Sequence, residues 1–206
     1  MRLTLLLLLA LNSVAVFAQT KRPKLVIGIV VDQMRQDYLQ RFEYHFGEDG
    51  FKRLMYDGFQ ARNNHYNYIP TYTAPGHASI YTGTTPKYHG IIANDWYSRV
   101  LGRSVYCVGD TLSNSVAGSA MNGNISPRNL QVNTITDELK LSTNFKSKVV
   151  GVSIKDRGAV LPAGHTPDGA YWYDSRTGEF MSSDYYFDEL PKWADTFNKK
   201  RLPNKY

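Results

Sequence analysis

Two β-branched apolar runs constrain the fold of this chain more than any other feature of its sequence. The first run, residues 25–31 (LVIGIVV), ends at Asp32. The second lies in residues 148–154 (KVVGVSI) and leads directly into Lys155-Asp156-Arg157. Continuous apolar runs without polar alternation are typical of strands that are buried on both faces. We therefore expect two interior strands of a covered sheet.

The segments between these runs have helical and hairpin patterns. Pro75 fits the first turn of a helix that Gly83 ends, and Ser126-Pro127 has the pattern of a helix start. Hairpins are expected to turn at Leu101-Gly102 and near residues 176–178. Helices are predicted over residues 35–47, just before Gly58, and over 73–82, 127–141 and 190–201. Strands that alternate with helices predict the α/β class, with a mostly parallel sheet flanked by helices and with β-hairpin insertions.

The N-terminus has the pattern of a secretory signal peptide. Arg2 provides the positive charge, residues 3–11 are almost entirely apolar, and small residues precede a cleavage site after Ala18. The apolar run is shorter than the roughly 20 residues that a membrane-spanning helix needs. We therefore expect residues 1–18 to be a signal peptide, no transmembrane segment, and export of residues 19–206 to the periplasm or the medium.

Cysteine content and charge narrow the possible functions further. Cys107 is the single cysteine, so no internal disulfide is possible, and its apolar surroundings indicate a buried structural thiol. The formal net charge is +6, which weakly favours anionic ligands. Lysine and arginine are scattered rather than gathered in a stripe, which argues against a nucleic-acid partner.

Several polar residues converge on one edge of the expected sheet. Asp32 ends the first apolar run, Lys155 and Arg157 end the second, and Thr73 opens a helix. In parallel α/β sheets, ligands bind at the carboxyl ends of the strands. This edge is therefore the expected site.

Each of these residues also has a structural interpretation. Thr73 is either a nucleophile or a simple helix cap, and Asp32 is either a metal ligand or the cap of the following helix. On an extended strand Lys155 and Arg157 would share a side, where they either grip phosphate oxygens or form a solvated pair. Asn94 either donates its amide to the same oxygens or makes a turn. From the residues alone, these alternatives stay open.

The joint pattern resembles a known family. The stretches VVDQMR, PTYTAPGHASIYTGTTPKYHGI, ANDW and IKDRGAVLPAG, which together span the chain from about Leu25 onward, are similar to the alkaline phosphatase superfamily. The resemblance is strongest to its zinc-dependent branch with a threonine nucleophile, the phosphate-irrepressible (PafA-type) bacterial alkaline phosphatases. Nucleotide pyrophosphatase/phosphodiesterases are the related group.

The resemblance implies a phosphate monoesterase with a two-zinc site. Thr73 would be the nucleophile, forming a phospho-threonine intermediate, and both Asp32 and Thr73 would bind zinc. Asn94, Lys155 and Arg157 would hold the phosphoryl oxygens of the substrate. In the family pattern three histidines are structural, namely His77, His89 and His165.

The chain lacks the family's remaining zinc ligands, since it contains no Asp-His pair and no Asp-x-x-x-His element. Catalytic zinc needs at least three protein ligands. We therefore expect residues 19–206 to be the N-terminal portion of an alkaline phosphatase-like domain that is inactive alone. The alternatives are a phosphodiesterase or nucleotide pyrophosphatase on the same scaffold, or a non-catalytic phosphate-binding fragment; a sulfatase is disfavoured because that branch uses a modified Cys or Ser. The sequence leaves the oligomeric state open.

Overall fold

The computed structural model describes residues 23–205, so the expected signal peptide lies outside the described residues. The chain divides into two compact units, Met1–Val31 and Asp32–Tyr206. None of the helices in the described part is both long enough and apolar enough to cross a bilayer.

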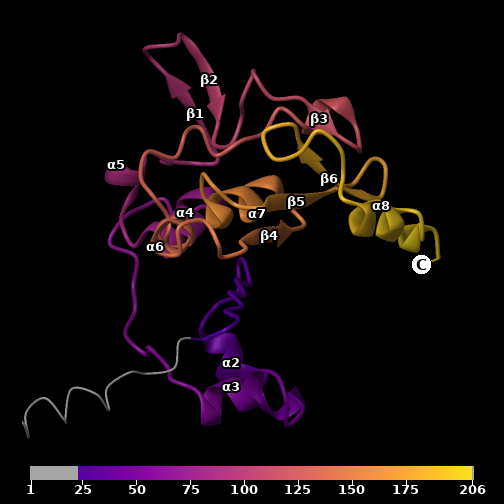
Figure 1. Cartoon of the computed structure of the whole chain (residues 1–206). Coiled ribbons are helices and arrows are strands. Elements are labelled where there is room, and N and C mark those ends of the chain that lie inside the picture. The colour runs from indigo at the N-terminus through magenta and orange to yellow at the C-terminus, as the bar shows by residue number, and fades with distance from the viewer. Residues whose placement is uncertain (1–22, 206) are drawn as a thin grey trace, which may run out of the picture. The chain divides into compact units, whose positions relative to one another are not determined.

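The second unit contains helices and short strands; its first part is helical, and the strands begin after α5 (Figure 1). Its helices are α2 (Asp37–Arg41), η1 (Glu43–His45), α3 (Phe51–Asp57), α4 (Thr73–Thr82), α5 (Pro86–His89), η2 (Ala120–Asn122), α6 (Ile135–Ser142), α7 (Asp156–Ala163), α8 (Lys192–Asn198) and η3 (Leu202–Lys205). Its strands are β1 (Asp95–Ser98), β2 (Arg103–Tyr106), β3 (Ser115–Val116), β4 (Val150–Ser153), β5 (Gly169–Asp174) and β6 (Glu179–Ser183).

The larger sheet is mixed, with the strand order β3-β6-β5-β4. β4 and β5 are parallel, with Val150 opposite Gly169, whereas β6 is antiparallel to both β5 and β3. The α/β class is therefore confirmed, but the described sheet is not mostly parallel. The reason is local: β5 and β6 are joined by a tight hairpin that ends at Gly178, whose φ is +74°, and hairpin-connected strands run in opposite directions.

The first predicted strand is not formed in the described structure. Residues 25–31 have no strand assignment, and Leu25 and Ile29 are 75% and 78% exposed. A strand needs a partner for its backbone and cover for its apolar faces, and the described part of the first unit contains neither. The expected burial of this run is therefore wrong for this structure.

The second predicted strand forms as β4, but it is covered on one face only. A Cβ on Gly151 would lie 2.3 Å from the carbonyl oxygen of Ala159, so this face of β4 is in close contact with α7. The alternating residues Val150 and Val152 lie on the other face and are more than half exposed. Because β4 is also the edge strand, the expected burial on both faces is wrong as well.

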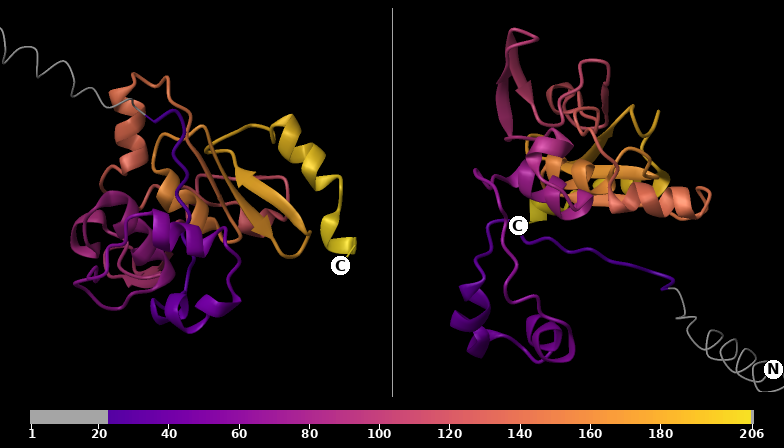
Figure 2. Two further views of the ribbon diagram at one scale, coloured as in Figure 1. Left: turned by 90° about the horizontal axis from the view of Figure 1, so that it is seen from below. Right: turned by 90° about the vertical axis from the view of Figure 1, so that its left-hand side faces the viewer.

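The core of the second unit lies between α4, α7 and the β5–β6 hairpin. Its members are mostly small or β-branched: Ala74, Ala78, Ile91, Cys107, Val108, Ile125, Leu130, Ala159, Val160, Leu161, Ala163, Ala170, Trp172 and Met181. Small side chains on α4 and α7 allow the two helices to approach closely. Figure 2 shows the β5–β6 hairpin running toward α8, where the side-chain oxygen of Asn198 accepts a hydrogen bond from Phe180 N at 2.9 Å.

Local signals place most helices where we expect them, with one clear exception. α4 begins at Thr73 and is followed by Gly83 in the left-handed region, as predicted. The helix predicted from residue 127 instead begins at Ile135. Thr134 is its N-cap, and Thr134 and Asp137 form a reciprocal capping box. The Ser126 hydroxyl donates to Asp110 and makes a turn instead.

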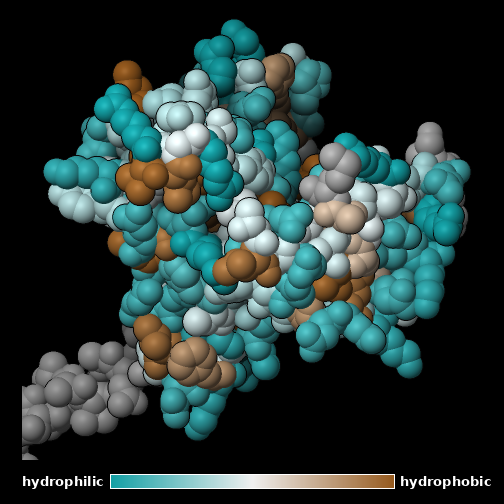
Figure 3. Space-filling view, turned by 90° about the horizontal axis from the view of Figure 1, so that it is seen from above, coloured by the Kyte–Doolittle hydropathy of each residue, from teal (hydrophilic) through white to brown (hydrophobic). Residues whose placement is uncertain are grey.

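Large apolar side chains are also exposed in several places on the described chain. On the face shown in Figure 3, they form separate brown patches on a mostly hydrophilic surface. Single exposed apolar residues are normal on protein surfaces and do not by themselves mark a site.

Candidate active site

The hydroxyl of Thr73 is not used to cap α4. Thr73 is the first residue of the helix, and Tyr72 stands at the N-cap without a side-chain hydrogen bond. The Thr73 hydroxyl donates instead to Oδ2 of Asp32 at 3.0 Å. Asp32 does not cap the next helix either, because α2 has Gln36 at its N-cap and no side-chain cap. The two structural interpretations that the sequence leaves open are therefore not realised.

Asn94 takes over the capping of α4 from a distant part of the chain. Its Oδ1 accepts a hydrogen bond from Ala74 N at 2.9 Å, which satisfies one of the free N–H groups at the helix start. Because the oxygen faces Ala74, the amide nitrogen Nδ2 points away from that N–H and has no hydrogen-bond partner among the described residues. Asn94 therefore presents two unused donors beside the helix that carries Thr73.

We expected Lys155 and Arg157 to lie on one extended strand. They lie instead at the start of α7. Lys155 is the N-cap residue of α7 and Arg157 lies in the first turn, so the alternation of a strand does not apply to them. The Lys155 side chain is exposed and makes no ion pair within the described part of the chain, whereas the Arg157 side chain is only 16% exposed. Both cations nevertheless lie just past the carboxyl end of β4.

His77 connects the first turn of α4 with the first turn of α7. Its Nδ1 lies 2.8 Å from the carbonyl oxygen of Thr73, and its Nε2 lies 3.7 Å from the position that a Cβ on Gly158 would occupy. The same Cβ would lie 2.5 Å from Ser153 Oγ. The absence of a side chain at Gly158 thus allows β4, α4 and α7 to approach one another. This close approach brings the helix starts that carry Thr73 and Arg157 together.

Tyr106 was not singled out by the sequence, yet it links the hairpin to α7. The hydroxyl of Tyr106 donates to Asp156 Oδ1 at 2.6 Å and accepts a hydrogen bond from Arg157 Nη1 at 2.9 Å. Burial, followed by the charge of Asp156, raises the pKa of Tyr106 far above its usual value, so the phenol stays neutral. The sequence did contain a signal for the position of Tyr106. A hairpin that turns at Leu101-Gly102 places Tyr106 opposite Asp95, and therefore near the predicted site residue Asn94.

A continuous chain of contacts therefore joins four of the five predicted site residues. Asp32 contacts Thr73, and Ala74 contacts Asn94, whose carbonyl oxygen accepts from Cys107 N at 2.9 Å. Tyr106, which precedes Cys107, accepts a hydrogen bond from Arg157 Nη1. Lys155 is placed beside this group only by its position next to Asp156.

His89 has a structural environment. Its Nδ1 accepts from Ile91 N, so Nε2 carries the proton and donates to Ser79 Oγ at 3.0 Å. Burial lowers the pKa of His89 to about 4, which keeps the ring neutral.

His165 is also committed to structural contacts. Its two ring nitrogens lie 3.1 Å from Asp137 Oδ2 and 2.9 Å from the carbonyl oxygen of Leu130. The hydrogen bond to Asp137 raises the pKa of His165. Neither His89 nor His165 is free to bind a metal or to transfer a proton to a substrate.

The metal donors near Thr73 make up only part of a zinc site. Asp32 Oδ2 and Thr73 Oγ1 are two oxygen donors 3.0 Å apart, close enough to bind one ion together. Among the described residues there is no group of three or more His, Cys, Asp and Glu side chains that could hold a metal. The pair fits a zinc site in the type of its donors, but it cannot form one alone.

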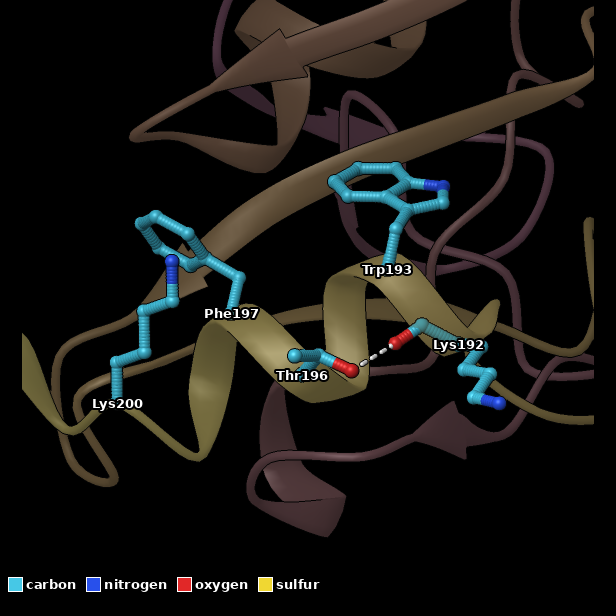
Figure 4. Close-up of a pocket in the computed structure, with 5 residues that line it drawn as sticks. All are labelled: Lys192, Trp193, Thr196, Phe197 and Lys200. Atoms are coloured by element: carbon cyan, nitrogen blue, oxygen red, sulfur yellow. Dashed lines mark hydrogen bonds between the residues drawn. The ribbon is translucent and has the colours of Figure 1, made fainter.

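Two other features are poor candidates for catalysis. Burial raises the pKa of the fully buried Cys107 thiol to about 12, so this cysteine is not a nucleophile. A hollow on α8 is lined by Lys192, Trp193, Thr196, Phe197 and Lys200 (Figure 4). It contains no carboxylate, and its one hydroxyl, that of Thr196, donates to the carbonyl oxygen of Lys192.

Comparisons with known proteins find similarity to alkaline phosphatases along most of the chain. The chain is 58% identical over 93% of its length to alkaline phosphatase PhoV of Synechococcus elongatus and 56% identical over 88% of its length to alkaline phosphatase PafA of Elizabethkingia meningoseptica. It spans about a third of the length of these relatives, 35% and 34% respectively.

A solved structure extends the similarity to the fold. A crystal structure of a PafA mutant, in which a threonine, an asparagine, a lysine and an arginine are replaced, matches with a TM-score of 0.88 and 52% identity. This match covers 90% of the present chain and 36% of the PafA chain. Residues 26–204 match the family described as type I phosphodiesterase / nucleotide pyrophosphatase. The chain belongs to this family.

Proposed function

We propose that the protein to which this chain belongs hydrolyses phosphate monoesters through a phospho-threonine intermediate on Thr73. The observation that carries the proposal is the hydrogen bond from the Thr73 hydroxyl to Asp32 at the first residue of α4. A threonine there lies among free N–H groups and at the positive end of the helix dipole, which favours a bound phosphate. The relatives named alkaline phosphatases support a phosphatase activity.

Asp32 orients the nucleophile. Its carboxylate accepts a 3.0 Å hydrogen bond from the Thr73 hydroxyl and so fixes the direction of Oγ1. A zinc ion bound by Asp32 and Thr73 would lower the pKa of the hydroxyl and make it a better nucleophile. Two such ions are expected in a complete site, and the other ligands would have to come from residues outside the described part.

The substrate phosphate is held by donors from two helix starts. Asn94 offers Nδ2, and Lys155 and Arg157 add positive charge at the start of α7. In the first step a bond forms between Thr73 Oγ1 and phosphorus while the ester P–O bond breaks and the alcohol leaves. In the second step water cleaves the Thr73–phosphate bond and restores the hydroxyl. The three donors stabilise the negative charge on the phosphoryl oxygens in both steps.

A phosphodiesterase is the second candidate, because the matching family is described by that activity. The cation pair separates the two functions, since a monoester carries one more negative charge than a diester. Replacing both Lys155 and Arg157 by alanine should reduce monoester turnover much more than diester turnover. Equal losses would favour the diesterase.

Replacement of Thr73 in the full-length gene product tests the proposal. With p-nitrophenyl phosphate and zinc, Thr73→Val should lose at least roughly 10³-fold in kcat, as expected when a nucleophile is removed. Thr73→Ser is the matched control, because it retains the hydroxyl and should retain turnover. A valine variant that turns over the ester as fast as wild type would overturn the proposal. The present chain alone should be inactive. If neither this chain nor the full-length protein hydrolyses the ester, but both bind phosphate, a passive binding role would be favoured.

We also propose that the protein is exported and processed after Ala18. Mass spectrometry of the periplasmic and extracellular fractions should find a mature N-terminus at Gln19. Recovery of the protein only in the cytoplasm with residues 1–18 attached would contradict this.

A further inference from the structure

We propose that Tyr106 is a positioning residue that holds the Arg157 guanidinium with one edge turned toward the phosphate. The inference rests on the proposed function and assigns a role to a residue of the β1–β2 hairpin. It concerns a hydroxyl that does not contact the reacting atoms but acts through Arg157.

The Tyr106 hydroxyl has a defined donor role and a defined acceptor role. Because Asp156 Oδ1 can only accept, the phenol donates to it at 2.6 Å and must accept from Arg157 Nη1 at 2.9 Å. Asp156 Oδ1 also accepts from the backbone N–H of Arg157 at 2.6 Å. The carboxylate, the phenol and the first turn of α7 therefore form one fixed group.

The bond to Nη1 leaves a defined part of the guanidinium unused. In arginine, Nη1 lies on the same side as Cδ, so Nη2 and Nε–H form the opposite edge. Nε of Arg157 is buried and has no hydrogen-bond partner in the described structure. A buried donor without a partner is costly, and the Nε–Nη2 edge has the spacing that binds two oxygens of a phosphate. The geometry points to a bidentate contact between this edge and the phosphoryl group.

The phenol also keeps Asp156 from forming a direct hydrogen bond with the Arg157 guanidinium. Nη1 of Arg157 and Oδ1 of Asp156 are 3.9 Å apart, too far for a hydrogen bond, and the Tyr106 oxygen bridges them. Without that oxygen, the adjacent carboxylate is the strongest available acceptor for the guanidinium. Loss of the hydroxyl should therefore turn Arg157 toward Asp156 and away from the substrate.

A double-mutant cycle in the full-length protein tests this role. Tyr106→Phe should reduce kcat/KM for a phosphate monoester about tenfold, the effect of one hydrogen bond to a charged group. In an Arg157→Ala background the same change should cost less than about twofold, because nothing remains to be positioned. Tyr97→Phe is the matched control: Tyr97 lies on β1 of the same hairpin, is 65% exposed, and should change neither value.

The outcomes separate this role from a general structural one and from the proposed function. Equal losses from Tyr106→Phe in both backgrounds, or no loss in either, would overturn the inference. If the wild-type protein does not turn over monoesters, the proposed function fails. The cycle is then measured by calorimetric binding of inorganic phosphate to wild type, Tyr106→Phe, Arg157→Ala and the double variant. Phosphate affinity that drops with Tyr106→Phe only when Arg157 is present supports the positioning role; unchanged affinity contradicts it.

Discussion

The side-chain oxygen of Asn94 accepts a hydrogen bond from the backbone N–H of Ala74 at 2.9 Å. One side chain thus caps α4 with its oxygen and turns its amide nitrogen outward beside Thr73. The stability of the helix start and the proposed recognition of phosphate depend on different atoms of the same residue.

Two substitutions of Asn94 should therefore separate stability from activity. Asn94→Asp keeps an acceptor for Ala74 N and adds a negative charge at a helix start, so the free energy of unfolding should stay equal or rise slightly. It removes the amide donor and repels phosphate, so kcat/KM for a monoester should fall at least roughly 100-fold. Asn94→Ala should lose about 1 kcal/mol of stability, the value of a cap. Urea unfolding and steady-state kinetics measure both; an aspartate variant with wild-type turnover would refute the assignment.

The Asp168 carboxylate should be important for stability. It accepts from the nearly buried Lys140, from Lys148 and from the backbone N–H of Val149, each at 2.8 Å. Asp168→Ala leaves the nearly buried Lys140 ammonium without its carboxylate partner, and only the carbonyl oxygen of Ser147 still accepts from it. We expect a loss of roughly 2–4 kcal/mol in the free energy of unfolding. Lys148→Ala is the control, because Lys148 is 79% exposed and its ion pair should contribute less than about 1 kcal/mol. Similar losses in the two variants would contradict this.

The same carboxylate predicts part of the acid sensitivity. Burial alone would raise the pKa of Asp168, but hydrogen bonds from the two lysines and from Val149 N outweigh it and lower the pKa to about 2. The folded-state pKa is below the unfolded value of about 3.9. Its contribution is therefore present above about pH 4 and is lost as the pH falls toward 2. In Asp168→Asn, this part of the decline in stability should be absent from acid titrations.

His89 should make stability depend on pH in a higher range. Burial lowers the pKa of His89 to about 4, below the unfolded value of about 6.5, so its contribution is present above about pH 6.5 and is lost as the pH falls toward 4. The difference in unfolding free energy between wild type and His89→Gln should narrow over this range by roughly 3 kcal/mol, by the usual conversion of a pKa shift. His45→Gln is the control, because His45 is exposed. A difference that does not change with pH would show that His89 is not held neutral.

Gly158 should tolerate a side chain poorly. A Cβ there would lie 2.5 Å from Ser153 Oγ and 3.2 Å from Ser153 Cβ, so Gly158→Ala should push the first turn of α7 away from β4 and cost roughly 1–3 kcal/mol. Arg157 lies in that turn, so turnover should fall as well. In a Ser153→Gly background the cost of Gly158→Ala should be smaller. An equal cost in both backgrounds would place the clash elsewhere.

Local signals were sufficient for much of the fold around the site. Pro75 and Gly83 predicted both ends of α4, and Leu101-Gly102 predicted the β1–β2 turn, because these residues act on the backbone directly. Burial could not be predicted in the same way. An apolar run such as residues 25–31 indicates that burial of its side chains is favourable. Whether they are buried depends on the strands and helices that other parts of a chain supply. The start of α6 was missed because the Thr134 capping box competes successfully with Ser126-Pro127.

For the site, contacts between distant residues limited the prediction. The sequence indicated Asp32, Thr73 and Asn94, and the structure brings them together through two hydrogen bonds. The roles of Tyr106 and Asp156 depend on a hydrogen bond between residues 50 positions apart, which no local pattern reports.

The β1–β2 hairpin has a consequence for how this family can diversify. Asn94 and Tyr106, which flank its base, form hydrogen bonds to α4 and α7, whereas Val100 at its tip is 95% exposed. A label or an insertion at Val100 is therefore expected to leave the hydrogen bonds at the base of the hairpin in place. An epitope or fluorophore inserted there would stand on a hairpin whose base is hydrogen-bonded to the starts of α4 and α7.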